Sequence, residues 1–387
     1  MKARRKGVAA NSKRTPTVRR VRPAIAPLAR SRTLPSAAGQ AGAVRTGPAT
    51  PAAGTPGPAS PALDALGGRP VDLAVDLGRG LLLPNPVIAA SGPFGYGVEV
   101  ADLVDLPRLG GIVTRSTSLK PRSGHPAPRV AEIPAGLLVG VGPQNPGLDM
   151  VLERYAEVWA RWPAPVILSL CADTAGELGE AVRRIDGVPG IAGLELNLSC
   201  GSGRGGGVPG LDPDVAGSYV AAARRGTDLP VIAKLTAAAG DVRAVARSVE
   251  DAGADAIAAI NTLPGFLPAA DRRGPALGAD YGGICGPALR PVALRVVWEV
   301  AQAVGVPIIG VGGVASAGDV LDFLAVGASA VGVGVAALAD PMLPVRLADE
   351  LADACRERGL AAVRDLVGTA LPGRSAAPST RGAEYAR

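Results

Sequence analysis

The sequence predicts a single-domain α/β protein, a (β/α)8 TIM barrel, preceded by a disordered N-terminal tail. From residue 71 onward, short apolar runs rich in β-branched residues alternate with helical patterns of 10–18 residues. This alternation is typical of βαβ units built around a parallel sheet. Eight such runs lie between residues 86 and 336, a length that suits one barrel of about 250 residues. A doubly wound open sheet is the structural alternative.

Eight apolar runs are expected to form the strands. In chain order they are "PVIAAS" (86–91), "GGIVTRST" (110–117), "VILSL" (166–170), "LELNLS" (194–199), "VIAKL" (231–235), "AIAAIN" (256–261), "PIIGVGG" (307–313) and "ASAVGVGVA" (328–336). Helices are predicted between them, at 174–188, 240–253, 287–304 and 316–327. Ser316 stands where it can cap the last of these helices.

The basic character of the chain belongs to its first 70 residues. They hold 13 Lys and Arg against one acid, Asp64, whereas the remainder holds 27 basic and 33 acidic residues. This Pro-, Ala- and Gly-rich segment cannot bury enough apolar surface to order itself. It is an inert extension (or a start codon called too early), a tether for nucleic acid or an anionic surface, or a transit-type peptide.

We therefore assign residues 1–70 to a disordered tail, 71–360 to the barrel and 361–387 to a C-terminal tail that is partly disordered. Because the barrel is mildly acidic, nucleic acid is not its expected partner. No apolar run approaches the roughly 20 residues that a membrane helix needs, so no membrane association is expected.

Four cysteines and one histidine limit the chemistry. Cys171, Cys200, Cys285 and Cys355 form no CxxC pair, and His125 is the only histidine. We therefore expect no zinc or iron–sulfur site. Nothing requires disulfides, so a cytoplasmic location is expected.

Several positions have plain structural interpretations. We expect Cys171 and Cys285 to be packing residues, Cys355 to lie on a helical surface, and His125 to be solvated or packed within its Pro-rich loop. Residues 263–281 form a long irregular excursion, which is either a lid or an interface. A charged loop that is either solvated or part of a partner surface contains Lys120, Arg122 and Arg129.

Polar residues and glycines collect where the predicted strands end. In a (β/α)8 barrel the active site lies at the carboxyl ends of the strands, and core packing gives no reason for charged and amide side chains to end four of them. The strand-end residues are Ser91, Arg115 and Ser116, Ser169, Asn197 and Cys200, Lys234, Asn261 and Thr262, Gly312 and Gly313, and Gly334 and Val335.

The glycines after the last two strands indicate a phosphate group. Gly312 and Gly313 allow close backbone approach, and "SAGDV" begins a helix directly afterwards. Backbone N–H groups and a helix N-terminus suit an anion at this place in a barrel. With Lys234 on the fifth strand, they predict a phosphorylated cofactor across the barrel mouth.

Cys200 ends a strand and faces the glycine-rich segment 201–210, "GSGRGGGVPG". A structural cysteine is usually a small buried hydrophobe. At a strand end beside an open loop, a cysteine is instead a candidate for chemistry.

The ordered motifs of residues 71–355 resemble those of the class 1 dihydroorotate dehydrogenases, and the NAD-linked 1B branch is the most similar. The resemblance rests on "NPVIAASGPFGYG", "PRVAEIPAGLLVGVGPQNPG", "LELNLSC", "AKLT", "INTLPG", "GGICGPALRPVALRVVWEV" and "VPIIGVGGVASAGDVLDFLAVGASAVGVGVA". It implies an FMN-dependent enzyme that oxidises dihydroorotate to orotate in pyrimidine biosynthesis.

The resemblance also implies site residues. FMN would be contacted by Ser91, Arg115, Ser116, Ser169, Asn197, Lys234, Ile260, Gly286, Gly312, Gly313, Gly334 and Val335. The substrate would be contacted by Arg115, Val139, Gly140, Val141, Gly142, Pro143, Asn197, Asn261 and Thr262. No metal ligand is implied.

Cys200 matches the catalytic base of the family. It would remove the C5 proton while a hydride leaves C6 for the flavin, and segment 201–210 would be the mobile loop that carries it. Lys234 would stabilise the negative charge that builds on the reduced flavin. An unperturbed thiol titrates near 8.5, so the site must favour the thiolate or the reaction must prefer alkaline pH.

Some positions depart from the family's pattern. Arg115 replaces a usual Lys, Val335 replaces a threonine at the flavin phosphate, and Ser202 follows Gly201 where Pro-Asn is usual. The stretch from Val139 to Pro143 replaces Asn-Ala-Ile-Gly-Leu. Two function alternatives therefore stay open: an FMN-dependent paralogue acting on another pyrimidine or cyclic substrate, and a flavin-binding barrel without turnover.

The 1B resemblance further implies a separate electron-transfer subunit that carries FAD and a [2Fe–2S] cluster and uses NAD. This chain has no clustered cysteines, and we expect none of its glycine-rich segments to act as a dinucleotide fingerprint that opens a helix. The resemblance also implies a homodimer of this chain as the core of the enzyme.

Overall fold

The eight predicted strands close into a parallel barrel. The computed structural model describes residues 70–200 and 207–373. The barrel order is β10-β13-β14-β3-β4-β7-β8-β9, so the predicted fold is confirmed. The strands are β3 Val87–Ala89, β4 Ile112–Val113, β7 Val166–Leu170, β8 Gly193–Asn197, β9 Val231–Leu235, β10 Ala256–Ala259, β13 Ile308–Val311 and β14 Ala330–Val333.

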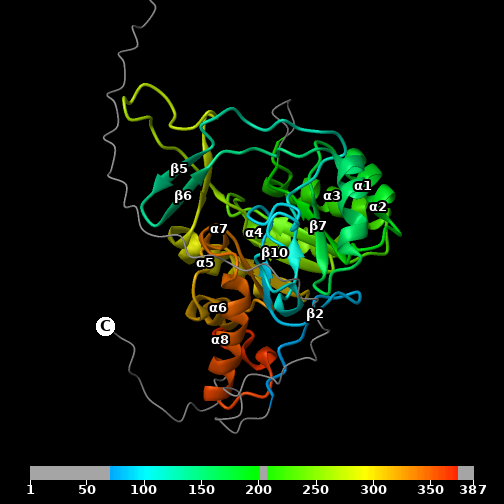
Figure 1. Ribbon diagram of the computed structural model, residues 1–387, viewed down its shortest axis with the longest axis vertical. Coiled ribbons are helices and arrows are strands. Elements are labelled where there is room, and N and C mark those ends of the chain that lie inside the picture. Colours follow the sequence, from blue (N-terminus) through cyan, green and yellow to red (C-terminus); the bar gives the residue numbers. More distant parts are fainter. Residues whose placement is uncertain (1–69, 201–206, 374–387) are drawn as a thin grey trace, which may run out of the picture. The chain divides into compact units, whose positions relative to one another are not determined.

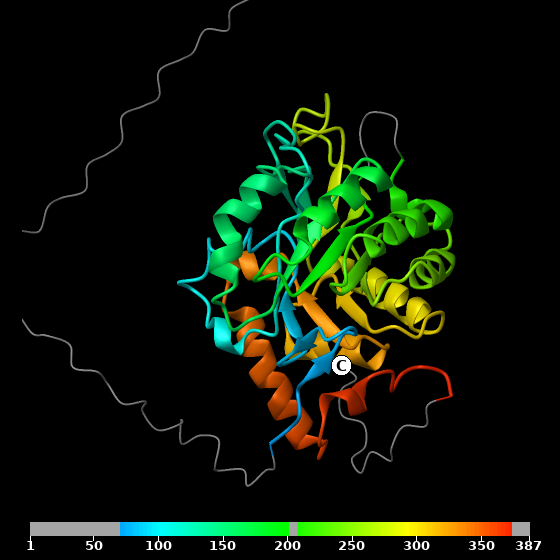
Figure 2. The ribbon, with the colours of Figure 1, turned by 90° about the vertical axis from the view of Figure 1, so that its right-hand side faces the viewer.

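Helices surround these strands (Figures 1 and 2). The α-helices are α1 Leu148–Trp159, α2 Ala175–Ile185, α3 Pro213–Arg224, α4 Val242–Asp251, α5 Arg290–Ala301, α6 Ala317–Ala325, α7 Ala336–Ala339 and α8 Leu343–Glu357. Short 3-10 turns are η1 Leu106–Arg108, η2 Pro209–Leu211, η3 Pro287–Leu289 and η4 Val363–Leu366. The four helices predicted by range correspond to α2, α4, η3 with α5, and α6.

Helix α4 illustrates why these segments are helical. Its buried residues, Val242, Val245, Ala246 and Val249, follow the i, i+3, i+4, i+7 spacing of one helix face. Asp241 caps its first turn by accepting the N–H of Ala244 at 3.0 Å. Burial of the apolar face against the barrel therefore stabilises a helix whose outer face is charged.

Ser316 caps α6 as predicted. Its Oγ accepts the Asp319 N–H at 3.3 Å, and Asp319 Oδ2 accepts the N–H groups of Ala315 and Ser316 at 2.9 Å each. This reciprocal arrangement is a capping box. Arg290 of α5 forms an ion pair with Asp319, which joins the start of α6 to its neighbour.

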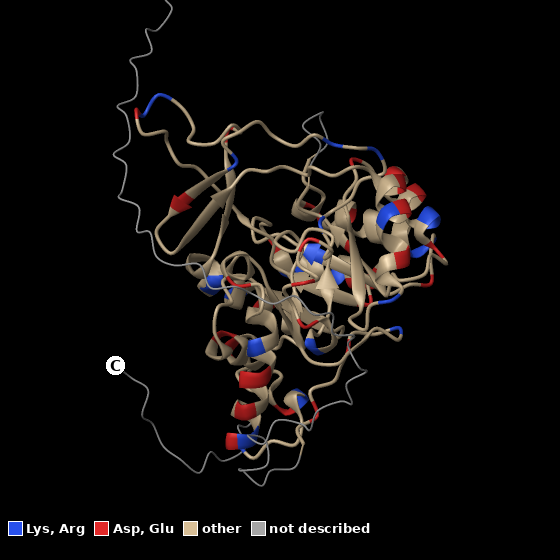
Figure 3. Cartoon of the chain, viewed as in Figure 1, with Lys and Arg blue, Asp and Glu red and all other residues tan. Residues whose placement is uncertain are grey.

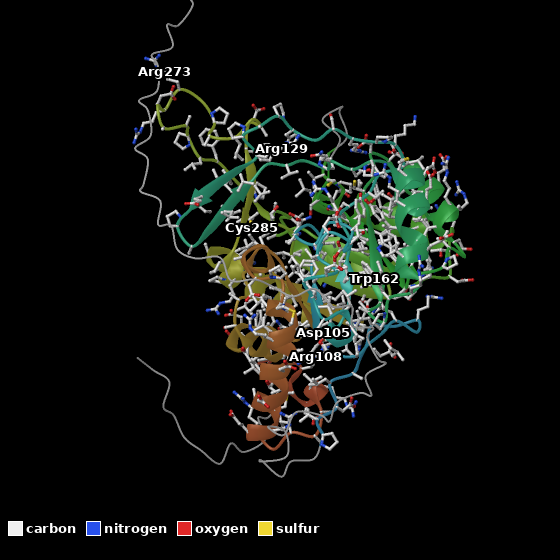
Figure 4. The ribbon with its side chains drawn as sticks, viewed as in Figure 1. Asp105, Arg108, Arg129, Trp162, Arg273 and Cys285 are labelled. Atoms are coloured by element: carbon white, nitrogen blue, oxygen red, sulfur yellow. The ribbon has the colours of Figure 1, made fainter. Side chains whose placement is uncertain are left out.

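A second sheet is built from the excursions that follow β4 and β10. Its order is β11-β12-β6-β5, with β5 Val130–Ile133, β6 Gly136–Val139, β11 Leu263–Gly265 and β12 Gly282–Cys285. Figure 1 shows β5 and β6 standing clear of the barrel helices. The excursion predicted as irregular over 263–281 therefore begins as a strand and returns as one. Within it, Arg273 lies at the outer tip (Figure 4).

The polypeptide after α8 remains packed against the barrel. Asp72 pairs with Ala362 in an isolated bridge, and the N–H groups of Gly368 and Ala370 bind the carbonyls of Leu324 and Ala325 at 2.9 Å. The C-terminal tail predicted from residue 361 thus begins as ordered structure. The predictions for residues 1–69, 201–206 and 374–387 lie outside the described residues.

Three structural expectations concern cysteines. Cys171 is buried, as expected of a packing residue, and half-buried Cys285 on β12 donates its thiol to the Leu137 carbonyl at 3.5 Å. Cys355 is fully buried on α8, so its predicted surface position is wrong. Its side chain lies on the apolar face that α8 turns to the core.

Charges of both signs are mixed over helices α1–α3 and over α8 (Figure 3). None of the helices within residues 70–200 and 207–373 is both long and apolar enough to cross a membrane. The short strand β5 carries Glu132 and forms the outer edge of the second sheet. A charge on an edge strand disfavours pairing with another sheet.

Candidate active site

The predicted strand-end residues meet at the carboxyl end of the barrel. Asn197 of β8 lies directly beside Lys234 of β9 in the parallel register. Asn261 follows β10, and its Nδ2 donates to Asn197 Oδ1 at 3.1 Å. Ser116 follows β4, and its Oγ accepts from Asn197 Nδ2 at 2.9 Å. Residues far apart in the sequence therefore form one polar surface at the barrel mouth.

This polar surface continues into the barrel. Ser116 Oγ lies 2.9 Å from Ser169 Oγ, and Ser169 donates to Glu195 Oε1 at 3.1 Å. The other oxygen of Glu195 lies 3.3 Å from Lys234 Nζ. Both side chains of this ion pair are buried, with 2% of Glu195 and 6% of Lys234 exposed. The site therefore stands on a buried, fully paired set of charges.

Glu195 is the residue that sequence reasoning missed. It lies two positions before Asn197, and residues i and i+2 of a strand point to the same face. The alternation in "LELNLS" was therefore a signal that Glu195 shares the barrel interior with Asn197. The predicted barrel makes β8 and β9 neighbours, but the ion pair depends also on their register, which the sequence does not show.

Arg115 reaches from the end of β4 to the predicted substrate stretch. Its Nε donates to the Gln144 carbonyl at 2.6 Å, and its Nη2 donates to the Gly142 carbonyl at 3.2 Å. The guanidinium thus fixes the stretch from Val139 to Pro143, a geometry that a lysine ammonium could not reproduce.

The substrate stretch has its backbone carbonyls engaged. Those of Gly140 and Val141 bind the ring Nδ1 and the backbone N–H of His125, at 3.2 and 3.0 Å. The Pro143 carbonyl accepts from Asn145 Nδ2 at 2.8 Å. Among the described residues, no hydrogen bond uses the N–H of Val141 or Gly142. This stretch therefore offers a ligand backbone donors.

Two residues of uncertain role in the sequence support this loop. His125 is exposed but hydrogen-bonds the Gly140 and Val141 carbonyls, in line with the expected solvated or loop-packed position. Arg129 donates Nε to the His125 carbonyl at 2.6 Å and also binds the Gln144 side chain. Figure 4 shows Arg129 on the same side of the molecule as Cys285 of β12. Of the charged loop, Arg129 therefore braces the substrate stretch.

The remaining rim residues occupy fixed backbone positions. Ser91 Oγ donates to the Thr114 carbonyl at 2.7 Å, and the Ile260 N–H binds the Val311 carbonyl at 2.9 Å. Thr262 donates its N–H to Asn261 Oδ1 at 2.8 Å. Its side chain occupies the space that a Cβ at Gly283 of β12 would need, so the second sheet closes over this edge of the rim.

The glycines after β13 and β14 form a cradle of backbone. Gly312 and Gly313 have φ values of 137° and 77°, which glycine adopts without strain. A Cβ at Gly313 would come within 2.9 Å of the Gly286 carbonyl oxygen, whereas one at Gly334 would meet nothing within 4 Å. No hydrogen bond in the described part of the chain uses the N–H of Gly312, Gly313, Gly334 or Val335.

These features fit the phosphate end of FMN. Free backbone N–H groups around open space suit a phosphate, and Lys234 supplies a cation inside the mouth. The N-terminus of α6 contributes less than the sequence predicted, because Asp319 already accepts the N–H groups of Ala315 and Ser316.

Cys200 lies three residues beyond β8, half-buried beside buried Cys171. A hydrogen bond with the Cys171 thiol lowers the pKa of Cys200, although burial opposes this. Nearby Arg122 and Arg115 also lower it, whereas Asp173 raises it. The same hydrogen bond and burial raise the pKa of Cys171 well above its usual value. Cys200 is therefore the more acidic thiol of the pair.

Arg122 owes its position to an ion pair. Its Nη2 lies 2.9 Å from Asp173 Oδ1, and its backbone N–H binds the Asn145 carbonyl at 2.9 Å. From the sequence, two interpretations of this arginine were open: part of a solvated loop, or part of a partner surface. In the structure its charge lies near Cys200 and favours the thiolate.

A groove of about 700 Å³ lies at the other end of the barrel, lined by Leu83, Trp159, Trp162, Pro165 and Ile191 among others. Pro165 directly precedes β7, so this groove is at the amino ends of the strands, where barrel residues serve stability. Within the described residues no cluster of three or more His, Cys, Asp or Glu side chains could hold a metal ion.

Comparisons with known proteins agree with the sequence motifs. The family model described as dihydroorotate dehydrogenase matches residues 74–355. The chain is 44% identical over 292 residues to the "Dihydroorotate dehydrogenase B (NAD(+)), catalytic subunit" of Desulforudis audaxviator, covering 75% of this chain and 95% of that protein. It is 46% identical over 298 residues to the protein of the same name from Pelobacter propionicus, covering 77% and 98%.

A solved structure supports the fold. The crystal structure of DHODH in complex with ferulenol from Eimeria tenella superposes with a TM-score of 0.65 and 22% sequence identity. The match covers 77% of this chain and 88% of that one.

Proposed function

The chain belongs to the dihydroorotate dehydrogenase family, and we propose that it oxidises dihydroorotate to orotate with FMN in pyrimidine biosynthesis. FMN dependence is general in this family. The observation that carries the proposal is the position of Cys200: a thiol of lowered pKa follows the strand whose Asn197 is hydrogen-bonded to Asn261 and Ser116.

In this proposal Cys200 is the catalytic base. Its thiolate takes the proton from C5 of dihydroorotate, and the electron pair of that C–H bond forms the C5–C6 double bond. FMN, when bound, accepts the hydride that leaves C6. The hydrogen bond with Cys171 and the charge of Arg122 lower the pKa of Cys200, which favours the thiolate that the base must be.

The other residues bind and orient. We propose FMN contacts from Ser91, Arg115, Ser116, Ser169, Asn197, Lys234, Ile260, Gly286, Gly312, Gly313, Gly334 and Val335, and substrate contacts from Arg115, residues 139–143, Asn197, Asn261 and Thr262. Lys234 offers its positive charge where negative charge builds on the cofactor. The amides of Asn197 and Asn261 suit the imide and carboxylate of the substrate.

We also propose the assembly. Relatives of this chain are named catalytic subunits of an NAD(+) enzyme, which supports a separate electron-transfer subunit. We infer that this subunit carries FAD and a [2Fe–2S] cluster, that two copies of the present chain form the core, and that the complex is cytoplasmic. The flavin-binding domain is assigned to residues 71–360.

A second candidate is an FMN-dependent oxidation of another pyrimidine or cyclic substrate. It is favoured by the stretch from Val139 to Pro143, which presents backbone N–H groups of Val141 and Gly142 in place of side-chain amides. A ligand bound through two backbone donors needs acceptor oxygens, which orotate and other cyclic imides share.

The test is an absorbance spectrum of the purified chain, followed by anaerobic addition of dihydroorotate. The expected result is a yellow flavoprotein whose visible band bleaches with dihydroorotate. Dithionite serves as the control for a reducible flavin. A colourless protein that binds no added FMN would refute both candidates. A flavin that dithionite bleaches, that dihydroorotate does not bleach and that another cyclic imide does bleach would favour the second.

A further inference from the structure

Glu195 is a buried carboxylate that the mechanism above does not use. It lies on β8 two residues before Asn197, so both side chains point into the barrel. Its Oε2 lies 3.3 Å from Lys234 Nζ, and only 2% of its side chain is exposed. A buried charge is stable only when it is paired and hydrogen-bonded. Glu195 therefore needs Lys234, and Lys234 needs Glu195.

One chain of hydrogen bonds runs from Asn261 across the rim to Glu195. Asn261 donates to Asn197, and Asn197 donates to Ser116. Ser169 donates its single hydroxyl proton to Glu195 Oε1. Ser116 must therefore be the donor in the hydrogen bond between the two serine hydroxyls. A carboxylate only accepts, and it therefore gives this chain of donors its direction.

We propose that Glu195 is a positioning residue of the flavin site, which holds Lys234 in place and offsets its charge, and thereby keeps the reduction potential of bound FMN low. The proposal rests on the function proposed above. Lys234 alone would favour the negatively charged reduced form of the cofactor. A carboxylate 3.3 Å away in a buried setting cancels much of that effect, because charges interact strongly where water is excluded. Reduced FMN then remains a strong donor for the next acceptor.

The test is the midpoint potential of bound FMN, measured by equilibration with a redox dye in the absence of substrate. Glu195→Gln keeps the size of the side chain but removes its charge. The expected result is an equilibrium constant for FMN reduction at least tenfold larger, which equals a positive shift of about 30 mV for a two-electron couple. Glu132→Gln is the matched control: it removes the same charge from the exposed face of β5, where salt screens it.

A Glu195→Gln flavoprotein with the wild-type potential, or with a lower one, would overturn the proposal. A pair of variants covers the case in which the single change prevents folding. Lys234→Gln alone is expected to lower the potential, and the double variant Lys234→Gln with Glu195→Gln is expected to return it to within threefold of the wild-type equilibrium constant. A double variant whose FMN potential is as low as that of Lys234→Gln would contradict the claim that Glu195 offsets the charge of Lys234.

This measurement separates the two proposals. Wild-type protein that binds no flavin would refute the proposed function itself. Wild-type protein that binds FMN and a Glu195→Gln variant of unchanged potential would refute only the role of Glu195, whichever substrate the enzyme oxidises.

Discussion

Among the four cysteines, only Cys200 has an environment that favours its thiolate. Its hydrogen bond with Cys171 is the leading cause of its lowered pKa, whereas burial raises the pKa of Cys285 and of Cys355. The sequence predicted a reactive Cys200 from its strand-end position. It also predicted Cys171 to be a packing residue. The predicted barrel placed β7 beside β8, but not the path of the segments after them that brings the two thiols into hydrogen-bond contact.

Replacing Cys171 should move the pH dependence of the reaction. The thiolate of Cys200 is present above its pKa, so the rate of FMN reduction falls as pH drops through that value. Cys171→Ala removes the hydrogen bond that lowers this pKa, and the acid limb of the rate profile should shift to higher pH. Stopped-flow reduction across a pH series measures the shift.

Cys355→Ala is the control for this prediction, because Cys355 lies on α8 and has no contact with Cys200. Its acid limb should coincide with that of the wild type. An acid limb that stays in place in Cys171→Ala would show that the thiol–thiol hydrogen bond does not tune the base.

Among the elements, the barrel strands were predictable and the second sheet was not. Strands buried on both faces appear as continuous apolar runs, and all eight were found. The strands β11 and β12 are only three and four residues long and contain Pro264, Gly282 and Gly283. Their pairing with β6, for example Gly283 with Val139, joins segments far apart in the chain, which no local pattern reveals.

Loss of the α6 cap should lower stability measurably. Ser316→Ala removes the oxygen that accepts the Asp319 N–H, and such a loss costs about 1 kcal/mol in the free energy of unfolding. Chemical denaturation monitored by circular dichroism gives the value. Ser218→Ala on α3 is the comparison, since the Ser218 hydroxyl only bonds the Val215 carbonyl within its own helix. Equal unfolding free energies for the two variants would argue against the capping role.

At the scale of the whole molecule, the barrel mouth is assembled from strand ends, from the segment after β4 and from the sheet that closes on it. Sequence motifs located the strand ends and the substrate stretch. They did not show that Arg115, His125 and Arg129 brace that stretch, because these contacts arise only when the loops fold over the rim.

The chain by itself should not use NAD at an efficient rate. The curated relatives of this chain are named catalytic subunits of an NAD(+) enzyme, and the proposed route to NAD runs through a second subunit. Steady-state assays of the purified chain should give turnover with an artificial electron acceptor and dihydroorotate, and negligible NADH formation. Efficient NADH formation by the chain alone would contradict the proposed assembly.

The central claim is that this barrel oxidises dihydroorotate with Cys200 as the base, and single-turnover reduction of FMN in Cys200→Ala tests it most directly. The variant should retain FMN, because the proposed flavin contacts come from other residues, while the rate of FMN reduction by dihydroorotate falls by roughly 10²–10⁴-fold. Cys200→Ser should keep some activity with its optimum at higher pH. A folded, FMN-loaded Cys200→Ala protein that dihydroorotate reduces at the wild-type rate would contradict the claim.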